Sequence, residues 1–81
     1  MGEMNTMEKI MEIVERCVGE MNLDSNTDLI ESGYMQSLAM MNIILELEET
    51  FGFETEAADL VRANFRSVST IESLVRKYIE R

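Results

Sequence analysis

The chain has 81 residues and a formal net charge of −9, because sixteen Asp and Glu residues face seven Lys and Arg residues. A nucleic-acid-binding protein needs the opposite charge to neutralise phosphates, so we expect no nucleic-acid partner. The chain is long enough for one small core, which predicts a single domain over residues 1–81. Proline is absent, aromatic residues are few, and helix-favouring residues dominate, so the composition predicts an all-α fold.

Composition also excludes several other classes of protein. Cys17 is the only cysteine, so there is no internal disulfide framework and no cysteine-based metal site. No segment is long and apolar enough to predict a membrane span. The first residues lack the basic patch and apolar run of a signal peptide, and we therefore expect a cytoplasmic location.

The first predicted helix begins near Asn5 and ends between Gly19 and Asn22. Apolar residues recur there at spacings of three and four, which is typical of one helix face: Met7, Ile10, Met11, Val14, Cys17, Val18 and Met21. Asn5 and Glu8 have the spacing of a capping box at the helix start. This stripe predicts that the Cys17 thiol is buried.

A long connection, residues 22–36, follows this helix and is rich in turn-forming residues. Its apolar residues are expected to hold it against the bundle: Leu29, Ile30, Tyr34 and Met35. Asp24, Asn26 and Asp28 have the spacing that opens a calcium-binding EF-hand loop. However, Leu29 stands where that loop needs glycine and Met35 where it needs glutamate, so we predict no metal site.

The second predicted helix covers residues 37–51. Leu38, Met41, Leu45 and Glu48 share one side, while a broader apolar side is formed by Met40, Ile43, Ile44, Leu47 and Phe51. Its first half is apolar nearly all round, which predicts a central helix with several neighbours. Gly52 is placed to end it as a left-handed cap.

Two further helices are predicted after Gly52. A short one over residues 56–62 would turn Ala57, Leu60 and Val61 inward. The last has an apolar stripe and a capping box formed by Ser69 and Glu72, and its stripe consists of Ile71, Leu74, Val75, Tyr78 and Ile79. Arg76, Lys77 and Arg81 would favour its C-terminal end through the helix dipole. The complete prediction is a small three- to four-helix bundle.

The side chains needed for common kinds of catalysis are missing. Without histidine, a Ser-His triad cannot form, and Ser37 has no evident base. There is also no glycine-rich phosphate loop of either standard kind. We therefore predict no catalytic residues and no enzyme activity.

The stretch from Asp28 to Phe53 carries the most specific pattern. It contains Leu29, Gly33 and Ser37-Leu38 at the head of an apolar helix, and it ends in Leu-Glu-Glu-x-Phe-Gly at residues 47–52. A later run, Phe65-x-x-Val68-x-x-Ile71, completes the pattern. Over nearly its whole length the chain resembles the acyl carrier protein family of fatty acid, polyketide and nonribosomal peptide synthesis, and this implies an acyl-carrier-like bundle.

The resemblance implies that Ser37 is the attachment residue of a covalent phosphopantetheine arm. A helix N-terminus independently favours an attached phosphate, although a serine there is more often a simple N-cap. The implied function is to hold an acyl or aminoacyl group as a thioester and deliver it between biosynthetic enzymes. Partners would be a phosphopantetheinyl transferase and enzymes that load or process the cargo, with the carrier acting as a monomer. The alternative is an unmodified carrier-like interaction module or adaptor subunit.

The chain departs from the family pattern around Ser37. Gln36 replaces the usual aspartate, and Ala39 and Asn42 replace acids typical of fatty-acid carriers. These differences imply a specialised carrier rather than a housekeeping fatty-acid carrier. Gln36, Leu38, Met40 and Met41 are predicted to contribute to partner recognition, with at least one of the two methionines in the core. Met40 and Ile44 are also placed to shelter a short cargo.

Overall fold

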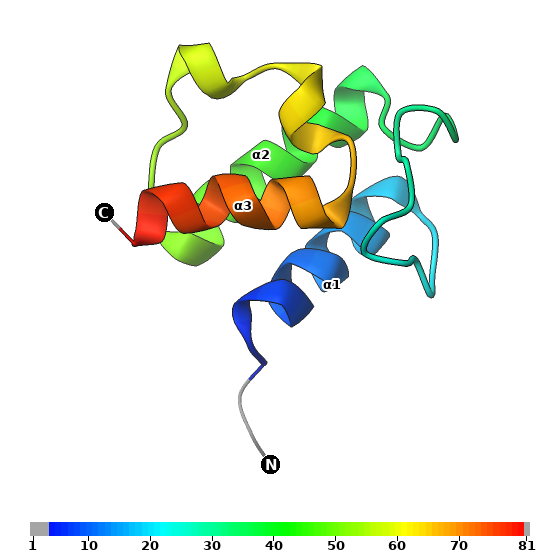
Figure 1. Ribbon diagram of the computed structural model, residues 1–81, viewed down its shortest axis with the longest axis horizontal. Coiled ribbons are helices and arrows are strands. Elements are labelled where there is room, and N and C mark those ends of the chain that lie inside the picture. The colour runs from blue at the N-terminus through cyan, green and yellow to red at the C-terminus, as the bar shows by residue number, and fades with distance from the viewer. Residues whose placement is uncertain (1–3, 81) are drawn as a thin grey trace.

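The computed structural model describes residues 4–80, which contain three α-helices and two short 3₁₀ segments (Figure 1). In chain order these are α1 (Thr6–Val18), α2 (Ser37–Phe51), η1 (Ala57–Asp59), η2 (Arg62–Phe65) and α3 (Val68–Ile79). There is no strand within residues 4–80, so the predicted all-α bundle is confirmed. None of the helices there is both long and apolar enough to cross a membrane.

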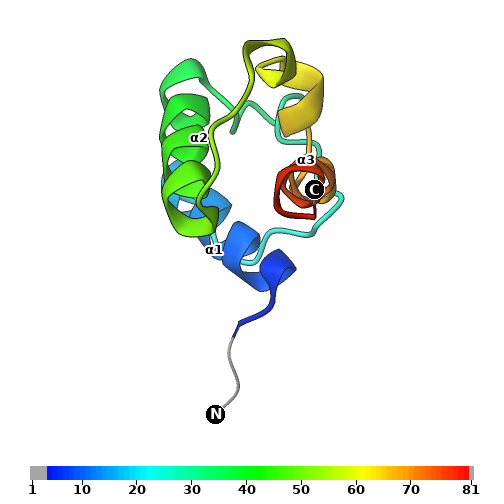
Figure 2. The same cartoon turned by 90° about the vertical axis from the view of Figure 1, so that its left-hand side faces the viewer.

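Helix α1 packs against both α2 and α3, and Figure 2 shows α3 end-on with α2 on one side and α1 below. The core between them is made of aliphatic side chains with one buried phenylalanine and one tyrosine: Ile10, Ile13, Val14, Leu29, Met35, Ile43, Leu47, Phe65, Val68, Ile71, Leu74, Val75 and Tyr78. Several of them are wholly inaccessible to water, including Val14, Ile43 and Ile71. Burial on this scale is the main force that holds the helices together.

The predicted start and end of α1 are confirmed, but two of its apolar residues differ from the prediction. The Asn5 side chain accepts from the Glu8 N–H at 2.8 Å, and the Glu8 carboxylate accepts from the Asn5 N–H at 3.0 Å. Gly19 ends the helix with a positive φ. Met21 lies beyond that end and is 76% exposed, because the chain leaves the helix before the apolar periodicity stops. Cys17 is only partly buried, so the prediction of a buried thiol was wrong.

The connection between α1 and α2 is held to the bundle as predicted. Leu29 and Met35 are buried in the core, and the Met35 N–H donates to the Leu29 carbonyl at 2.8 Å. The Leu29 N–H donates to the carbonyl of Arg66 at 2.7 Å, just before α3. Two buried side chains and two backbone bonds therefore fix the segment that leads into α2.

The segment between α2 and α3 corrects two predictions. Instead of a helix over residues 56–62 there are two separate 3₁₀ turns, and Ala57, Leu60 and Val61 face solvent. Phe65 is the side chain that this segment buries.

The start of α3 also differs from the prediction. The capping box uses Ser67 and Thr70, not Ser69 and Glu72, because the helix begins two residues earlier. The Thr70 N–H donates to the Ser67 hydroxyl at 3.2 Å. At the other end, Ile79 is 39% exposed and so contributes little to the predicted stripe. Arg76 and Lys77 lie in the last turn as predicted, while Arg81 is outside the described residues.

Candidate functional site

Ser37 is the first residue of α2, and its side chain is exposed. The residue before it, Gln36, has the extended backbone of an N-cap, with φ −86° and ψ 163°. The Met40 N–H donates to the Gln36 carbonyl at 2.8 Å and closes the first helical turn. The N-cap position therefore belongs to Gln36, and the Ser37 hydroxyl is not required to cap the helix.

The N-terminal end of α2 lacks a side-chain cap, unlike the other two α-helices. Asn5 and Ser67 cap α1 and α3, whereas Gln36 makes no cap hydrogen bond and its amide nitrogen instead lies 3.5 Å from the Gly33 carbonyl. The first turn of α2 also contains no acidic residue. Backbone N–H groups at a helix start have no partner within the helix, and the helix dipole is positive there. This end of α2 is therefore suited to an attached anionic group.

The loop that precedes Ser37 is fixed by a buried side chain and by a hydrogen bond to its backbone. Met35 is buried, and its carbonyl accepts from the Arg62 guanidinium at 3.3 Å. Gly33 has φ +85°, a conformation that residues with a Cβ rarely adopt, and this allows the chain to turn toward α2. The exposed serine is thus presented by a fixed backbone.

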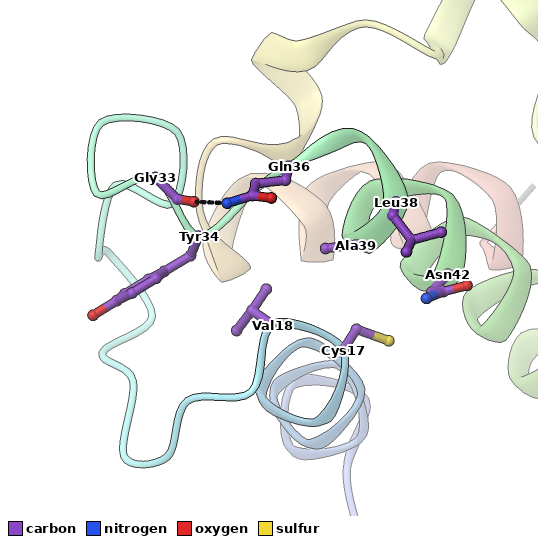
Figure 3. Close-up of a pocket in the computed structure, with 8 residues that line it drawn as sticks. All are labelled: Cys17, Val18, Gly33, Tyr34, Gln36, Leu38, Ala39 and Asn42. Carbon is purple, nitrogen blue, oxygen red and sulfur yellow. Dashed lines mark hydrogen bonds between the residues drawn. The ribbon is translucent and has the colours of Figure 1, made fainter.

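A surface groove of about 310 Å³ lies beside Ser37, between the C-terminal end of α1, the connecting loop and the first turns of α2 (Figure 3). Its lining combines apolar side chains with one phenol, two side-chain amides and one thiol: Cys17, Val18, Gly33, Tyr34, Gln36, Leu38, Ala39 and Asn42. A second hollow of about 410 Å³ shares Cys17 and Asn42 with it and extends to Arg16 and Glu46. The two hollows together run along the contact between α1 and α2.

Charged and polar groups meet in the second hollow. The Glu46 carboxylate pairs with the Arg16 guanidinium through one oxygen, and its other oxygen accepts from the Cys17 thiol at 3.3 Å. The hydrogen bond from Arg16 holds the pKa of Glu46 below its usual range, so Glu46 is anionic near neutral pH. Partial burial, followed by the hydrogen bond with Glu46, raises the pKa of Cys17 to about 11. Sequence reasoning missed this cluster because Glu46 is far from Arg16 and Cys17 in the chain.

Helix α2 exposes an apolar strip on its outer side. Leu38, Met41 and Leu45 are 71%, 60% and 59% exposed. The prediction of a central helix packed on several neighbours was therefore wrong for this side, since α1 and α3 cover only the opposite one. Met40 is partly buried against the core, so one of the two methionines faces inward as predicted.

The oxygen-rich part of the connecting loop stabilises turns. Asp24 accepts from the Asn26 N–H at 2.8 Å, and Asp28 accepts from the N–H groups of Ile30 and Glu31. The second Asp28 oxygen pairs with Arg66 at 2.9 Å. Within residues 4–80 there is no group of three or more Cys, Asp or Glu side chains arranged to hold a metal ion.

Comparison with known proteins adds sequence relationships to this geometry. Residues 8–77 match the family described as "Phosphopantetheine attachment site". The chain is also similar to the D-alanyl carrier protein of Leuconostoc mesenteroides subsp. mesenteroides, with 29% identity over 77 residues. That match covers 89% of this chain and 99% of the relative. No solved structure matches the chain significantly.

Proposed function

Because the chain belongs to the phosphopantetheine-attachment family, we propose that Ser37 carries the arm and that the protein delivers a small aminoacyl group as a thioester. Phosphopantetheine is the covalent cofactor of this carrier protein. We also infer that the carrier domain extends over the whole of residues 1–81.

The observation that carries the assignment is the exposed Ser37 hydroxyl at the uncapped start of α2, within the matched residues. In the modification, the Ser37 Oγ bonds to the phosphorus of coenzyme A that bears the pantetheine. The bond to the second phosphate breaks, adenosine bisphosphate leaves, and the serine proton passes to a base of the transferase. The product phosphodiester is anionic, and the free N–H groups of α2 stabilise an anion at that position.

Two observations support a small aminoacyl cargo. The relative's name describes it as a carrier of a D-alanyl group. In addition, the centre of the bundle is closed, because Ile10, Val14 and Ile43 are wholly inaccessible to water. A long acyl chain would have to separate these packed side chains, and protein interiors resist such changes. A cargo of a few atoms needs no such opening.

The enzymes that modify, load and unload the carrier are its proposed partners. Gln36, just before α2, and Leu38 and Met41, in its first turns, are exposed close to Ser37 and are available for contact. Met40 packs against the core, so its effect on recognition would be indirect. An adaptable apolar surface of this kind suits partners whose contacting face is apolar rather than strongly basic. The cytoplasmic location and the monomeric state stay predictions.

One observation favours the alternative, an unmodified interaction module. Gln36 stands where the family usually has aspartate, and a neutral amide forms weaker contacts with a basic enzyme group than a carboxylate does. An adaptor of this kind would keep the fold and the exposed apolar strip of α2 without the arm. Complete resistance of Ser37 to a transferase would support it.

The cargo is tested on protein that already carries the arm. We would incubate it with ATP, D-alanine and an amino-acid-activating ligase, and in parallel with malonyl-coenzyme A and a malonyl transferase. We expect a hydroxylamine-labile D-alanyl adduct by intact mass, with no adduct on Ser37→Ala. Loading by malonate alone would contradict the aminoacyl assignment.

A further inference from the structure

The groove between α1 and α2 begins beside the attachment residue. Gln36, Leu38 and Ala39, the neighbours of Ser37 in sequence, all contribute to its lining. Its volume of about 310 Å³ lies at the lower end of the range of small-molecule sites, roughly 300–1,000 Å³. Ser37 itself does not line the groove, so a group tethered to it enters the groove by passing across the first turn of α2.

The rise of α2 from Ser37 to Glu46, a residue of the second hollow, is comparable with the length of the arm. From Ser37 to Glu46 the axis of α2 rises by about 14 Å, at 1.5 Å per residue. The phosphopantetheine arm has as many chain bonds as four to five extended residues, which gives roughly 15 Å. Nine residues turn an α-helix by about 900°, so Ser37 and Glu46 lie on opposite sides of α2, and the arm first has to cross the N-terminal end of the helix. The aminoacyl group adds roughly one residue's length to the arm, so the cargo rather than the arm itself reaches the height of Glu46.

The lining also matches the chemistry of the arm. A pantetheine arm contains two amide groups, a hydroxyl and a pair of methyl groups. The side-chain amides of Gln36 and Asn42 can donate to and accept from the amides of the arm, while Val18 and Ala39 offer apolar surface to the methyl groups (Figure 3).

The second hollow, which Glu46 and Arg16 line, suits a positive charge. Glu46 remains anionic, and Arg16 occupies one of its oxygens. Within residues 4–80, the other oxygen accepts from the Cys17 thiol, and a thiol is a weak donor. An ammonium group is a much stronger donor to a carboxylate and would displace it.

We propose that the arm lies in the groove between α1 and α2, and that the ammonium of an aminoacyl cargo binds the Glu46 carboxylate in the adjoining second hollow. This inference depends on the proposed function, because it requires an arm on Ser37. It adds a docking site for the arm and a residue that distinguishes an aminoacyl cargo from an uncharged acyl group of the same size.

The first test is to compare backbone amide NMR shifts of the protein with and without the arm. Intact mass first shows whether the arm is attached, so failure of the modification is separated from failure of docking. A docked arm is expected to shift the amides of Val18 and Asn42 as strongly as that of Leu38. Shifts confined to residues 36–39 would overturn the proposed docking site.

The second test isolates the ammonium. Amide-linked coenzyme A analogues, which resist hydrolysis, would place either an alanyl or a propionyl group on the arm. The alanyl form is expected to shift the Arg16, Cys17 and Glu46 amides more than the propionyl form, and Glu46→Gln should abolish that difference. Glu12→Gln is the matched control, because it removes the other carboxylate next to Arg16 and should preserve the difference. Equal shifts for the two cargoes, or an unaltered difference in Glu46→Gln, would overturn the role of Glu46.

Discussion

Gln36 occupies the N-cap of α2 but does not perform the function of a cap. Its side chain is too long to reach the N–H groups of the first turn as Asp, Asn or Ser do, and it turns back toward Gly33 instead. The same residue is the clearest difference between this chain and the family pattern around Ser37. Stability and modification can therefore be altered together by one substitution.

Replacing Gln36 with Asp is expected to stabilise the protein. The shorter carboxylate would accept from the Ala39 N–H and complement the helix dipole, a gain of about 1 kcal/mol. In a domain of this size that raises the melting temperature by about 5 °C. Thermal unfolding followed by circular dichroism measures it. Gln36→Asn, which caps without charge, should give most of the gain, and a lower melting temperature in both variants would contradict the geometry.

The same pair of variants separates charge from capping in the modification of Ser37. A carboxylate can pair with a basic group or metal ion of a general transferase, and such contacts are stronger than neutral ones. We expect Gln36→Asp to be modified several-fold faster than the parent protein, and Gln36→Asn at about the parent rate. Initial rates at equal protein concentration provide the measurement. If Gln36→Asn were modified as fast as Gln36→Asp, the charge of the carboxylate would not explain the faster modification.

Asp28 makes the stability of the connecting loop depend on pH. The N–H of Glu31 and the guanidinium of Arg66 lower the pKa of Asp28 in the folded protein. A lowered folded pKa means that the stabilisation is complete above the unfolded value, near 4, and is lost as the pH falls through the folded value. Asp28→Asn should therefore lower the melting temperature at pH 7 and much less at pH 3. An equal effect at both pH values would rule out an ionic contribution.

At the scale of the helices, the start of α3 gives the sharpest test of the structure against the sequence pattern. The Ser67 side chain is 7% exposed and caps the helix, whereas Ser69 is in the first turn. Ser67→Ala should cost about 1–2 kcal/mol, because a buried cap is lost. Ser69→Ala removes one exposed hydrogen bond, to Asn26, and should cost less. Urea unfolding of both variants decides which serine is the cap, and a reversed order would contradict the structure.

The sequence predicts helices well where apolar spacing and end signals agree. In α2, the loop before Ser37 and the glycine at position 52 enclose an apolar run, and the predicted bounds are those of the structure. At residues 56–62 only apolar residues indicated a helix, and Leu60 and Val61 turned out to be exposed. Apolar residues on a short segment do not reveal whether a neighbouring element is near enough to bury them.

The candidate site could be located from the sequence only in part. The placement of Ser37 at the head of α2 followed from its position before an apolar helix. The groove and the contact of Glu46 with Arg16 and Cys17 did not, because they depend on how α1 and α2 pack. Residues thirty positions apart meet only through that packing, and nothing in local spacing indicates it.

For the whole molecule, the excess of acidic residues lowers the stability of the fold through charge repulsion. Six ion pairs are present among the described residues, but pairs on exposed surfaces contribute little. Repulsion among the remaining acids opposes folding and is screened by salt. The melting temperature at pH 7 should therefore rise between about 10 and 200 mM NaCl. Near pH 4.5, where many carboxylates are protonated, the rise should shrink, and a fall with salt at pH 7 would contradict this account.

The role of Ser37 as attachment residue is tested most directly by the intact mass of the protein after incubation with coenzyme A and a broad-specificity phosphopantetheinyl transferase. We predict a single adduct of about 340 Da, located on Ser37 by fragmentation. Ser37→Ala should stay folded and unmodified, while Ser32→Ala, a control in the preceding loop, should be modified like the parent. An adduct that persists in Ser37→Ala, or no adduct on the parent protein, would contradict the assignment of Ser37 as the attachment residue.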